Sequence, residues 1–154
     1  MDLYLLRHGK AGEAPRDEDR ELTPHGHEQA RAVAAGIAWL SLELDAILSS
    51  PLPRARQTAA PVAEALKMRL DEATPLASGR TPEAALALLP RRGERVLVVG
   101  HEPQLSGIIR AVTGGRAHMR KAMLAHIEVR SLKPPGGELG WLLSWRHLQR
   151  LGRP

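Results

Sequence analysis

Residues 3–9 read Leu3-Tyr4-Leu5-Leu6-Arg7-His8-Gly9, an apolar run that turns polar within one residue. A short apolar run that stops at a charged loop is typical of a buried strand. Ala46-Ile47-Leu48 is a second such run, and it ends at Ser49-Ser50-Pro51. Arg95 to Val99 is the most β-branched segment of the chain, and it ends at Gly100-His101. β-Branched residues favour strands, so we predict three buried strands, the last of them central.

The segments between these strands have apolar residues at the spacing of a helix. Thr23 and Pro24 have the pattern of an N-cap followed by the first helical residue, and apolar side chains recur at helical spacing to about Leu40. In the same way, Ser50 predicts the cap and Pro51 the start of a helix that runs to about Leu66. Two further helices are predicted, one from Thr81-Pro82-Glu83 to about Leu89 and one from Leu105 to Val112.

The remaining segments are a loop and a pair of strands. Residues 10–21 lack apolar periodicity and predict an exposed loop. Met123 to Val129 and Trp141 to Arg146 read as strands, with Pro134-Pro135-Gly136-Gly137 as the turn between them. Strands that alternate with helices predict a three-layer α/β/α sandwich with a mostly parallel central sheet, and the last two strands add antiparallel pairing at one side. We expect one domain over residues 1–154.

The composition excludes several classes of protein. The chain has 154 residues, 43% of them hydrophobic, and a formal net charge of +5 that arginine mostly supplies. It has no cysteine, which excludes disulfide scaffolds, thiolate metal sites and cysteine nucleophiles. Only 3% of the residues are aromatic and none is Phe, so a base-stacking surface for nucleic acid is not expected. No apolar run is long enough for a membrane span or a signal peptide, which predicts a cytoplasmic protein.

Arginine and histidine residues follow the three predicted strands. In open α/β sheets, ligands bind beyond the carboxyl ends of the strands. There the sequence places Arg7, His8 and Gly9 after the first strand, Arg54 in the first turn of the helix after the second, and His101 after the third. Arginines offer paired donors to phosphoryl oxygens, and a neutral histidine offers a nitrogen nucleophile. The helix predicted to begin at Pro51 would add the positive end of its dipole.

Four segments in this order resemble the histidine phosphatase superfamily, which is also called phosphoglycerate mutase-like. Arg7-His8-Gly9 matches its signature, and residues 22–30, Leu-Thr-Pro-His-Gly-His-Glu-Gln-Ala, are similar to its Leu-Thr-x-x-Gly-x-x-Gln-Ala segment. Residues 50–59, Ser-Pro-Leu-Pro-Arg-Ala-Arg-Gln-Thr-Ala, are similar to its Ser-Pro-x-x-Arg-Ala-x-Gln-Thr segment, and residues 100–103, Gly-His-Glu-Pro, to its Gly-His-x-Pro. The resemblance covers residues 1 to about 113, and the rest of the chain agrees only in pattern.

The resemblance implies a role for each matching residue. His8 would be the nucleophile that is transiently phosphorylated, and Arg7 and Arg54 would bind the phosphoryl oxygens. His101 would donate to those oxygens in the transition state, and Gly9 would lie in the substrate site. The resemblance implies a phosphoglycerate mutase-like fold and a hydrolase that needs no metal or other cofactor. Neighbouring cations should also keep the His8 ring neutral.

The chain departs from larger members of the family, which carry a lid and a carboxylic general acid. Between the second predicted helix and the central strand, none of the carboxylates stands in a version of the acid-bearing motif. Glu83 is the nearest candidate, but a carboxylate at the start of a helix is expected for its interaction with the dipole. A phosphohistidine can leave as neutral imidazole without such an acid. The chain therefore looks most like the short SixA-type phosphohistidine phosphatases, which implies a histidine-containing phosphotransfer domain as the phosphorylated partner.

Three other functions remain open from the sequence. The first is a small-molecule phosphomonoesterase that acts on a phosphorylated metabolite such as a sugar phosphate or a nucleotide, and an essential Glu83 would favour it. The second is a module that binds phosphate or a phosphoprotein without catalysis, although such a module would not need a nucleophile. The third, a basic nucleic-acid binder, is not expected. Gln57 and Thr58 could support the site or only pack the helix, and His25 and His27 are expected to be surface residues rather than metal ligands.

Overall fold

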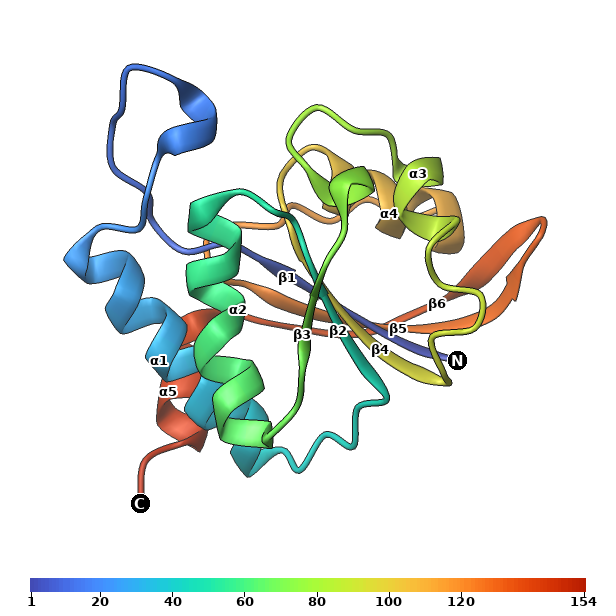
Figure 1. The fold of residues 1–154 in the computed structure, drawn as a ribbon. Coiled ribbons are helices and arrows are strands. Elements are labelled where there is room, and N and C mark those ends of the chain that lie inside the picture. Colours follow the sequence, from blue (N-terminus) through green and yellow to red (C-terminus); the bar gives the residue numbers. More distant parts are fainter.

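The computed structural model describes residues 1–154 and contains one six-stranded sheet with the order β3-β2-β4-β1-β5-β6 (Figure 1). The strands are β1 (Asp2–Arg7), β2 (Ala46–Ser49), β3 (Leu70–Glu72), β4 (Arg95–Gly100), β5 (Leu124–Leu132) and β6 (Pro135–Leu143). The helices are α1 (Pro24–Trp39), α2 (Pro53–Leu66), α3 (Pro82–Leu86), α4 (Gln104–Thr113) and α5 (Trp145–Leu151). β4 lies between β2 and β1, as its β-branched sequence predicts.

Parallel pairing dominates the sheet. β4 pairs in parallel with both β1 and β2, and β2 pairs in parallel with β3. β5 pairs antiparallel with β1, and β6 pairs antiparallel with β5. The prediction of a mostly parallel sheet with antiparallel strands at one side is therefore confirmed.

Helices cover both faces of the sheet, so the molecule has three layers (Figure 1). Alternate residues of β1 point to opposite faces, as the two-residue period of a strand requires. Leu3 and Leu5 belong to the apolar cluster that α3 and α4 cover, whereas Tyr4 and Leu6 belong to the cluster that α1, α2 and α5 cover. The predicted three-layer α/β/α sandwich is confirmed. The two apolar clusters pack against the two faces of the sheet and bury its strands on both sides.

The start of the first helix agrees with the sequence, but that of the second does not. The Thr23 hydroxyl accepts a hydrogen bond from the Gly26 N–H at 3.0 Å, and Pro24 is the first residue of α1. The predicted start of α2 at Pro51 is wrong, because α2 begins at Pro53. The Ser50 hydroxyl instead accepts from the Leu52 N–H at 3.1 Å and closes the turn before the helix. Either proline could occupy the first position of a helix, so the local pattern did not choose between them.

The last third of the chain departs most from the prediction. β5 and β6 are longer than expected and meet at Lys133-Pro134, so Pro135 and the two glycines after it belong to β6 rather than to a turn. Residues 145 and 146 were predicted as strand, but they begin α5. The Ser144 hydroxyl and the His147 ring form a capping box there, and such a cap favours a helix over a continued strand. α3 ends earlier than predicted, and the three-residue edge strand β3 was not predicted.

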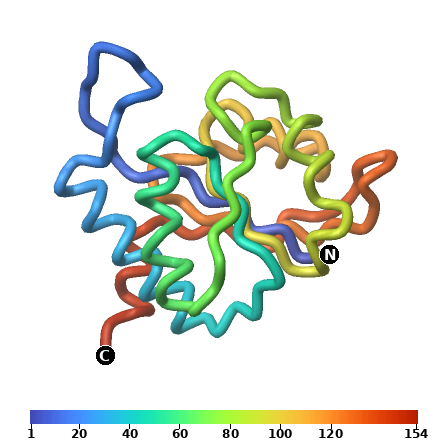
Figure 2. Tube along the Cα trace, in the orientation of Figure 1, coloured from blue at the N-terminus to red at the C-terminus, as the bar shows by residue number.

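Residues 10–21 form a loop, as predicted, with a single 3-10 turn, η1 (Asp17–Asp19). The loop projects from the body of the molecule beyond the carboxyl end of β1 (Figure 2). A bridge between Ala11 and Leu22 closes its base. None of the helices is both long and apolar enough to cross a membrane.

Candidate active site

The sheet brings the two signature histidines together. β1 and β4 are neighbouring parallel strands, and Arg7 lies opposite Gly100 in their register. The His8 N–H donates to the Gly100 carbonyl at 3.2 Å, so the residues that follow the two strands stay adjacent. The ring centroids of His8 and His101 are 5.1 Å apart. Residues more than ninety positions apart in sequence thus share one rim of the sheet, as we expected from the topology.

Thr58 ties Arg54 to the residues after β1. Arg54 lies in the first turn of α2, and its side chain is 4% exposed. The Thr58 hydroxyl donates to the Arg54 carbonyl at 2.8 Å and accepts from the Gly9 N–H at 3.0 Å. A single buried hydroxyl therefore fixes the start of α2 against the backbone beside His8. Of the two readings that the sequence left open for Thr58, this contact favours support of the site.

Backbone contacts fix the tautomer of His8. Its Nδ1 lies 2.7 Å from the Gly9 carbonyl oxygen, which can only accept a hydrogen bond. Nδ1 must therefore carry the hydrogen, and Nε2 keeps its lone pair. Burial is the main cause that lowers the pKa of His8, to about 3. The hydrogen bond to Gly9 opposes this effect, and the positive charges of Lys121 and Arg54 add to it. At neutral pH the ring is neutral and its Nε2 can act as a nucleophile.

Three polar nitrogens of the site have no hydrogen-bond partner within the protein. They are Nε of Arg7, Nε of Arg54 and Nδ1 of His101, and all three are buried. Buried polar groups are normally paired, and groups without a partner inside the protein occur where a ligand supplies one. His101 holds its other nitrogen, Nε2, 2.7 Å from the Ser50 hydroxyl. Burial and then the Arg54 charge lower the pKa of His101 to about 4.

The two arginines are each anchored at one end. Arg7 donates from Nη1 to the Met119 carbonyl at 2.8 Å, and burial lowers its pKa against the opposing charge of Glu102. Arg54 donates from Nη1 to the Asp17 carbonyl at 2.8 Å and from Nη2 to the Asp17 carboxylate at 3.1 Å. After burial, the charges of both guanidinium groups lower the pKa of His101, so these contacts hold two arginines close to that ring, where an oxyanion would find paired donors.

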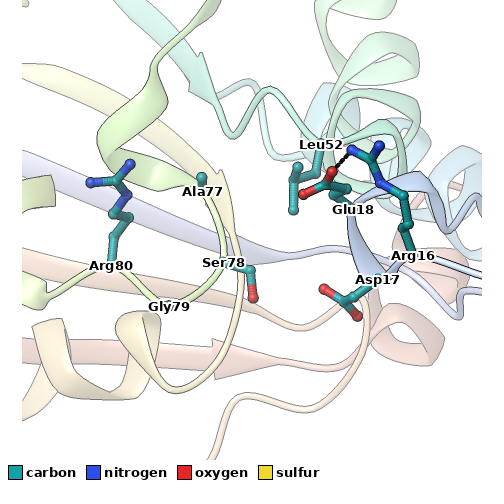
Figure 3. Close-up of a pocket in the computed structure, with 8 residues that line it drawn as sticks. All are labelled: Arg16, Asp17, Glu18, Leu52, Ala77, Ser78, Gly79 and Arg80. Atoms are coloured by element: carbon teal, nitrogen blue, oxygen red, sulfur yellow. Dashed lines mark ion pairs between the residues drawn. The ribbon is translucent and has the colours of Figure 1, made fainter.

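Asp17 joins the projecting loop to the site. A hydrogen bond from Arg20 and then one from Arg54 lower the pKa of Asp17, so its carboxyl group is ionised at neutral pH. Asp17 also lines a cleft of about 500 Å³, which Figure 3 shows between two walls. Arg16, Asp17 and Glu18 form one wall with Leu52, and the turn 77–80 forms the other. Asp17 therefore connects this cleft with Arg54, which does not line it.

Sequence reasoning missed three residues around the site: Asp17, Ser50 as a partner of His101, and Lys121. Ser50 belongs to one of the four motifs, and its hydroxyl bonds both Leu52 and His101. Asp17 stands in a loop without periodicity, and Lys121 follows a glycine-rich connection late in the chain. Neither position carries a local signal, because both reach the site only through the tertiary fold.

Glu83, the candidate acid, does not lie with the histidines and arginines of the site. It is exposed in the first turn of α3, behind Thr81, whose hydroxyl caps that helix by accepting from the Ala84 N–H. Glu83 lines a different cleft with Leu132 and Lys133, at the tip of the β5–β6 hairpin. Its position in the first helical turn agrees with the interaction with the helix dipole that the sequence predicted. His25 and His27 belong to no group of side chains that could hold a metal ion.

The lowered pKa values predict that acid destabilises the fold. His8 and His101 have pKa values of about 3 and 4 in the folded protein and 6.5 when exposed. Below pH 6.5 the unfolded chain binds protons that the folded chain does not, so stability is full above pH 6.5 and falls as the pH drops toward 4. Between pH 7 and pH 4.5 we expect a loss on the order of 2 kcal/mol for each histidine. Urea unfolding at both pH values measures it.

The matched control is the double variant His8→Gln with His101→Gln, which has neither titrating ring. Its free energy of unfolding should fall less between the two pH values than that of the wild type. Equal losses in the two proteins would contradict the assignment of two neutral buried histidines.

Comparisons with known proteins agree with this geometry. Residues 3–78 match the family model described as histidine phosphatase superfamily (branch 1). An uncharacterized protein of Picosynechococcus sp. is 34% identical over 137 residues, which cover 79% of this chain and 81% of that protein. The phosphohistidine phosphatase SixA of Escherichia coli is 28% identical over 151 residues, 94% of each chain. The crystal structure of a candidate SixA from Agrobacterium tumefaciens superposes with a TM-score of 0.80 at 28% identity and covers 93% of this chain and 97% of that one.

The matches to the two SixA proteins extend over nearly the whole chain, including the last third that the motifs do not cover. They support phosphatase activity of the histidine phosphatase type and a phosphoglycerate mutase-like fold. The chain belongs to the histidine phosphatase superfamily and is similar to its SixA members.

Proposed function

We propose that this protein is a phosphohistidine phosphatase that removes phosphate from a histidine side chain of another protein. The observation that carries the proposal is the His8 ring, whose Nδ1–H is bound to the Gly9 carbonyl while Nε2 keeps its lone pair. The half-buried guanidinium group of Arg7 and the buried one of Arg54 lie on the same rim, and the His101 ring lies 5.1 Å from that of His8. We also propose that residues 1–154 form a single domain, and the pairing of β5 and β6 in the same sheet supports this.

In the first step, His8 Nε2 attacks the phosphorus atom and the bond from phosphorus to the substrate imidazole breaks. Arg7 and Arg54 bind the phosphoryl oxygens, and His101 donates to them once it carries a proton on the nitrogen that faces them. Gly9 lies beside the bound group and holds the His8 tautomer. In the second step, water attacks phosphorus, the bond to Nε2 breaks and His8 is again neutral with its hydrogen on Nδ1. Phosphate leaves as dihydrogen phosphate, which carries both protons of the water.

The state of the carboxylates nearest to the site favours a phosphohistidine over a phosphate ester as the substrate. An alkoxide leaving group needs a proton from an acid, whereas a phosphohistidine that is protonated on its second ring nitrogen leaves as neutral imidazole. The Asp17 carboxyl group is ionised, since hydrogen bonds from Arg20 and Arg54 lower its pKa. Glu102 accepts hydrogen bonds from the N–H and the hydroxyl of Ser106, at 2.8 and 2.6 Å, as a carboxylate does. Asp17 is ionised and both oxygens of Glu102 act as acceptors toward Ser106, so neither side chain is arranged to give a proton to an ester.

A folded protein is the substrate that suits the surroundings of the site. The cleft in Figure 3 has charged residues on both walls, with Leu52 and the small residues 77–79 between them. Asp17 of this lining accepts a hydrogen bond from Arg54. A histidine-containing phosphotransfer domain could place its phosphorylated side chain at Arg54 and rest on both walls. Similarity to the phosphohistidine phosphatase SixA of Escherichia coli supports the same substrate class. A cleft of about 500 Å³ also has room for a small phosphorylated metabolite, which is the second candidate.

A hydrolysis assay separates the two candidates. Wild type and His8→Ala are compared on a phosphohistidine-bearing phosphotransfer domain and on p-nitrophenyl phosphate, all with EDTA present. We expect the phosphohistidine protein to be the better substrate by at least about a hundredfold in kcat/KM, because only the ester lacks a proton donor. Faster hydrolysis of the ester by wild type would favour the small-molecule phosphomonoesterase, and loss of activity in EDTA would contradict a metal-independent reaction.

A further inference from the structure

Lys121 is held beside the proposed phosphoryl site by its neighbours in the chain. The Ala122 N–H lies 3.1 Å from the carbonyl oxygens of both Arg7 and His8 and donates to both. Two residues before Lys121, the Met119 carbonyl accepts the hydrogen bond from Arg7 Nη1 at 2.8 Å. The backbone around Lys121 is thus fixed to the end of β1 on both sides. Its ammonium group acts directly on the site, since its charge lowers the pKa of both His8 and His101.

The Lys121 side chain is half-buried and forms no ion pair or hydrogen bond with another residue. The charged groups that face it come from β1, from the loop around η1 and from α2. They are the guanidinium groups of Arg7, Arg20 and Arg54 and the Asp17 carboxylate, with the His8 and His101 rings close by. Asp17 already accepts hydrogen bonds from Arg20 and Arg54. Asp17 is therefore the carboxylate that acts on Lys121 within a group of four cations, and Glu102 opposes only the charge of Arg7.

Positive charge of this density is costly unless an anion compensates it. The phosphoryl group carries two negative charges near neutral pH, and in the transition state its charge spreads over three oxygens. We propose that the Lys121 ammonium group binds an oxygen of the substrate phosphoryl group and is the third cation of the site, beside Arg7 and Arg54. This inference rests on the proposed function, and it adds a residue that none of the four sequence motifs contains.

The assignment predicts how oxyanion binding depends on pH. Burial and then the charges of Arg7, Arg20 and Arg54 lower the pKa of Lys121 to about 8. Without ligand, Lys121 is therefore charged at pH 7 and mostly neutral at pH 9. A bound oxyanion favours the ammonium form, so binding at pH 9 must first take up a proton. The dissociation constant for an oxyanion should accordingly rise about tenfold between pH 7 and pH 9.

The experiment uses calorimetric titration of tungstate, a tetrahedral oxyanion without a proton in this pH range, at constant ionic strength. Wild type should lose about tenfold in affinity from pH 7 to pH 9. Lys121→Arg keeps a positive charge that does not titrate, so its affinity should stay level over the same range. Lys121→Met should bind weakly at both pH values. Lys133→Met, which removes an exposed lysine from the β5–β6 hairpin at the far end of the sheet, should behave as wild type.

The outcomes distinguish this inference from the proposed function. Equal affinities of wild type and Lys121→Met, or the same loss at pH 9 in wild type and Lys121→Arg, would overturn the role of Lys121 and leave the phosphatase site standing. No tungstate binding by wild type would instead contradict the oxyanion site itself. Hydrolysis of the phosphohistidine protein by the same preparations reports on the proposed function separately.

Discussion

Replacing His8 with alanine should lower kcat by at least about 10⁴-fold, the scale of loss when a covalent nucleophile is removed. His8 is 3% exposed, and its Nε2 carries the only lone pair that the Gly9 contact leaves free on the ring. Alanine retains the backbone hydrogen bonds of this position but removes the atom that would accept the phosphoryl group. Turnover of a phosphohistidine protein, measured with excess substrate, gives the change in kcat.

Trapping the intermediate makes the test specific for covalent catalysis. Wild type mixed with a ³²P-labelled phosphohistidine protein and quenched in base should carry label on His8, and His8→Ala should carry none. Tungstate should still bind to the variant within about tenfold of wild type, because both arginines remain. His25→Ala removes an exposed histidine of α1 and should retain full activity. Label on the His8→Ala chain, or turnover within tenfold of wild type, would contradict His8 as the nucleophile.

Replacing Arg54 with alanine should lower kcat/KM by about 10³-fold, which corresponds to about 4 kcal/mol of transition-state stabilisation. Arg54 is buried beside the two histidines, so water cannot replace its charge effectively. Its loss also frees Asp17, and with it the loop wall of the cleft. Arg54→Lys keeps the charge but loses the planar pair of donors, so we expect an intermediate loss. Initial rates at low substrate concentration measure the change.

Arg56→Ala is the matched control for this variant. Arg56 lies two residues further along α2, is 47% exposed and pairs with Glu72 at 3.6 Å. Exposed ion pairs contribute little, so its removal should change kcat/KM by less than about twofold. Thermal unfolding shows whether each variant is folded. A folded Arg54→Ala that loses less than tenfold, or an equal loss in Arg56→Ala, would contradict a direct role of Arg54 in binding the phosphoryl group.

The sequence predicts the central part of this fold well for a physical reason. β1, β2 and β4 are buried on both faces, so they read as continuous apolar runs, and each ends at polar residues. The carboxyl ends of parallel strands share one rim, which makes the convergence of Arg7, His8 and His101 a consequence of topology. Thr23 marks its helix because the cap and the proline beside it are local signals.

Other features depend on contacts that local patterns do not encode. The start of α2 is decided by the turn that Ser50 closes, while Pro51 and Pro53 satisfy the same local rule. The start of α5 has a local signal, because Ser144 stands three residues before His147 in the pattern of a helix cap. The apolar residues from Trp141 onward favour a strand over the same stretch. Asp17 and Lys121 reach the site from two loops, and only the packed sheet brings those loops to the same place.

The strand order has a consequence for how this site comes into being. β1 is made first by the ribosome, yet its two neighbours in the sheet are β4 and β5, which follow about ninety or more residues later. Such long-range pairing slows folding, and it leaves both edges of β1 without partners until most of the chain has emerged. The stretch that carries the family match, residues 3–78, contains neither partner strand. His8 therefore acquires its environment only after β4 and β5 have been made, so a chain truncated before β4 would carry the Arg7-His8-Gly9 signature without His101 beside it.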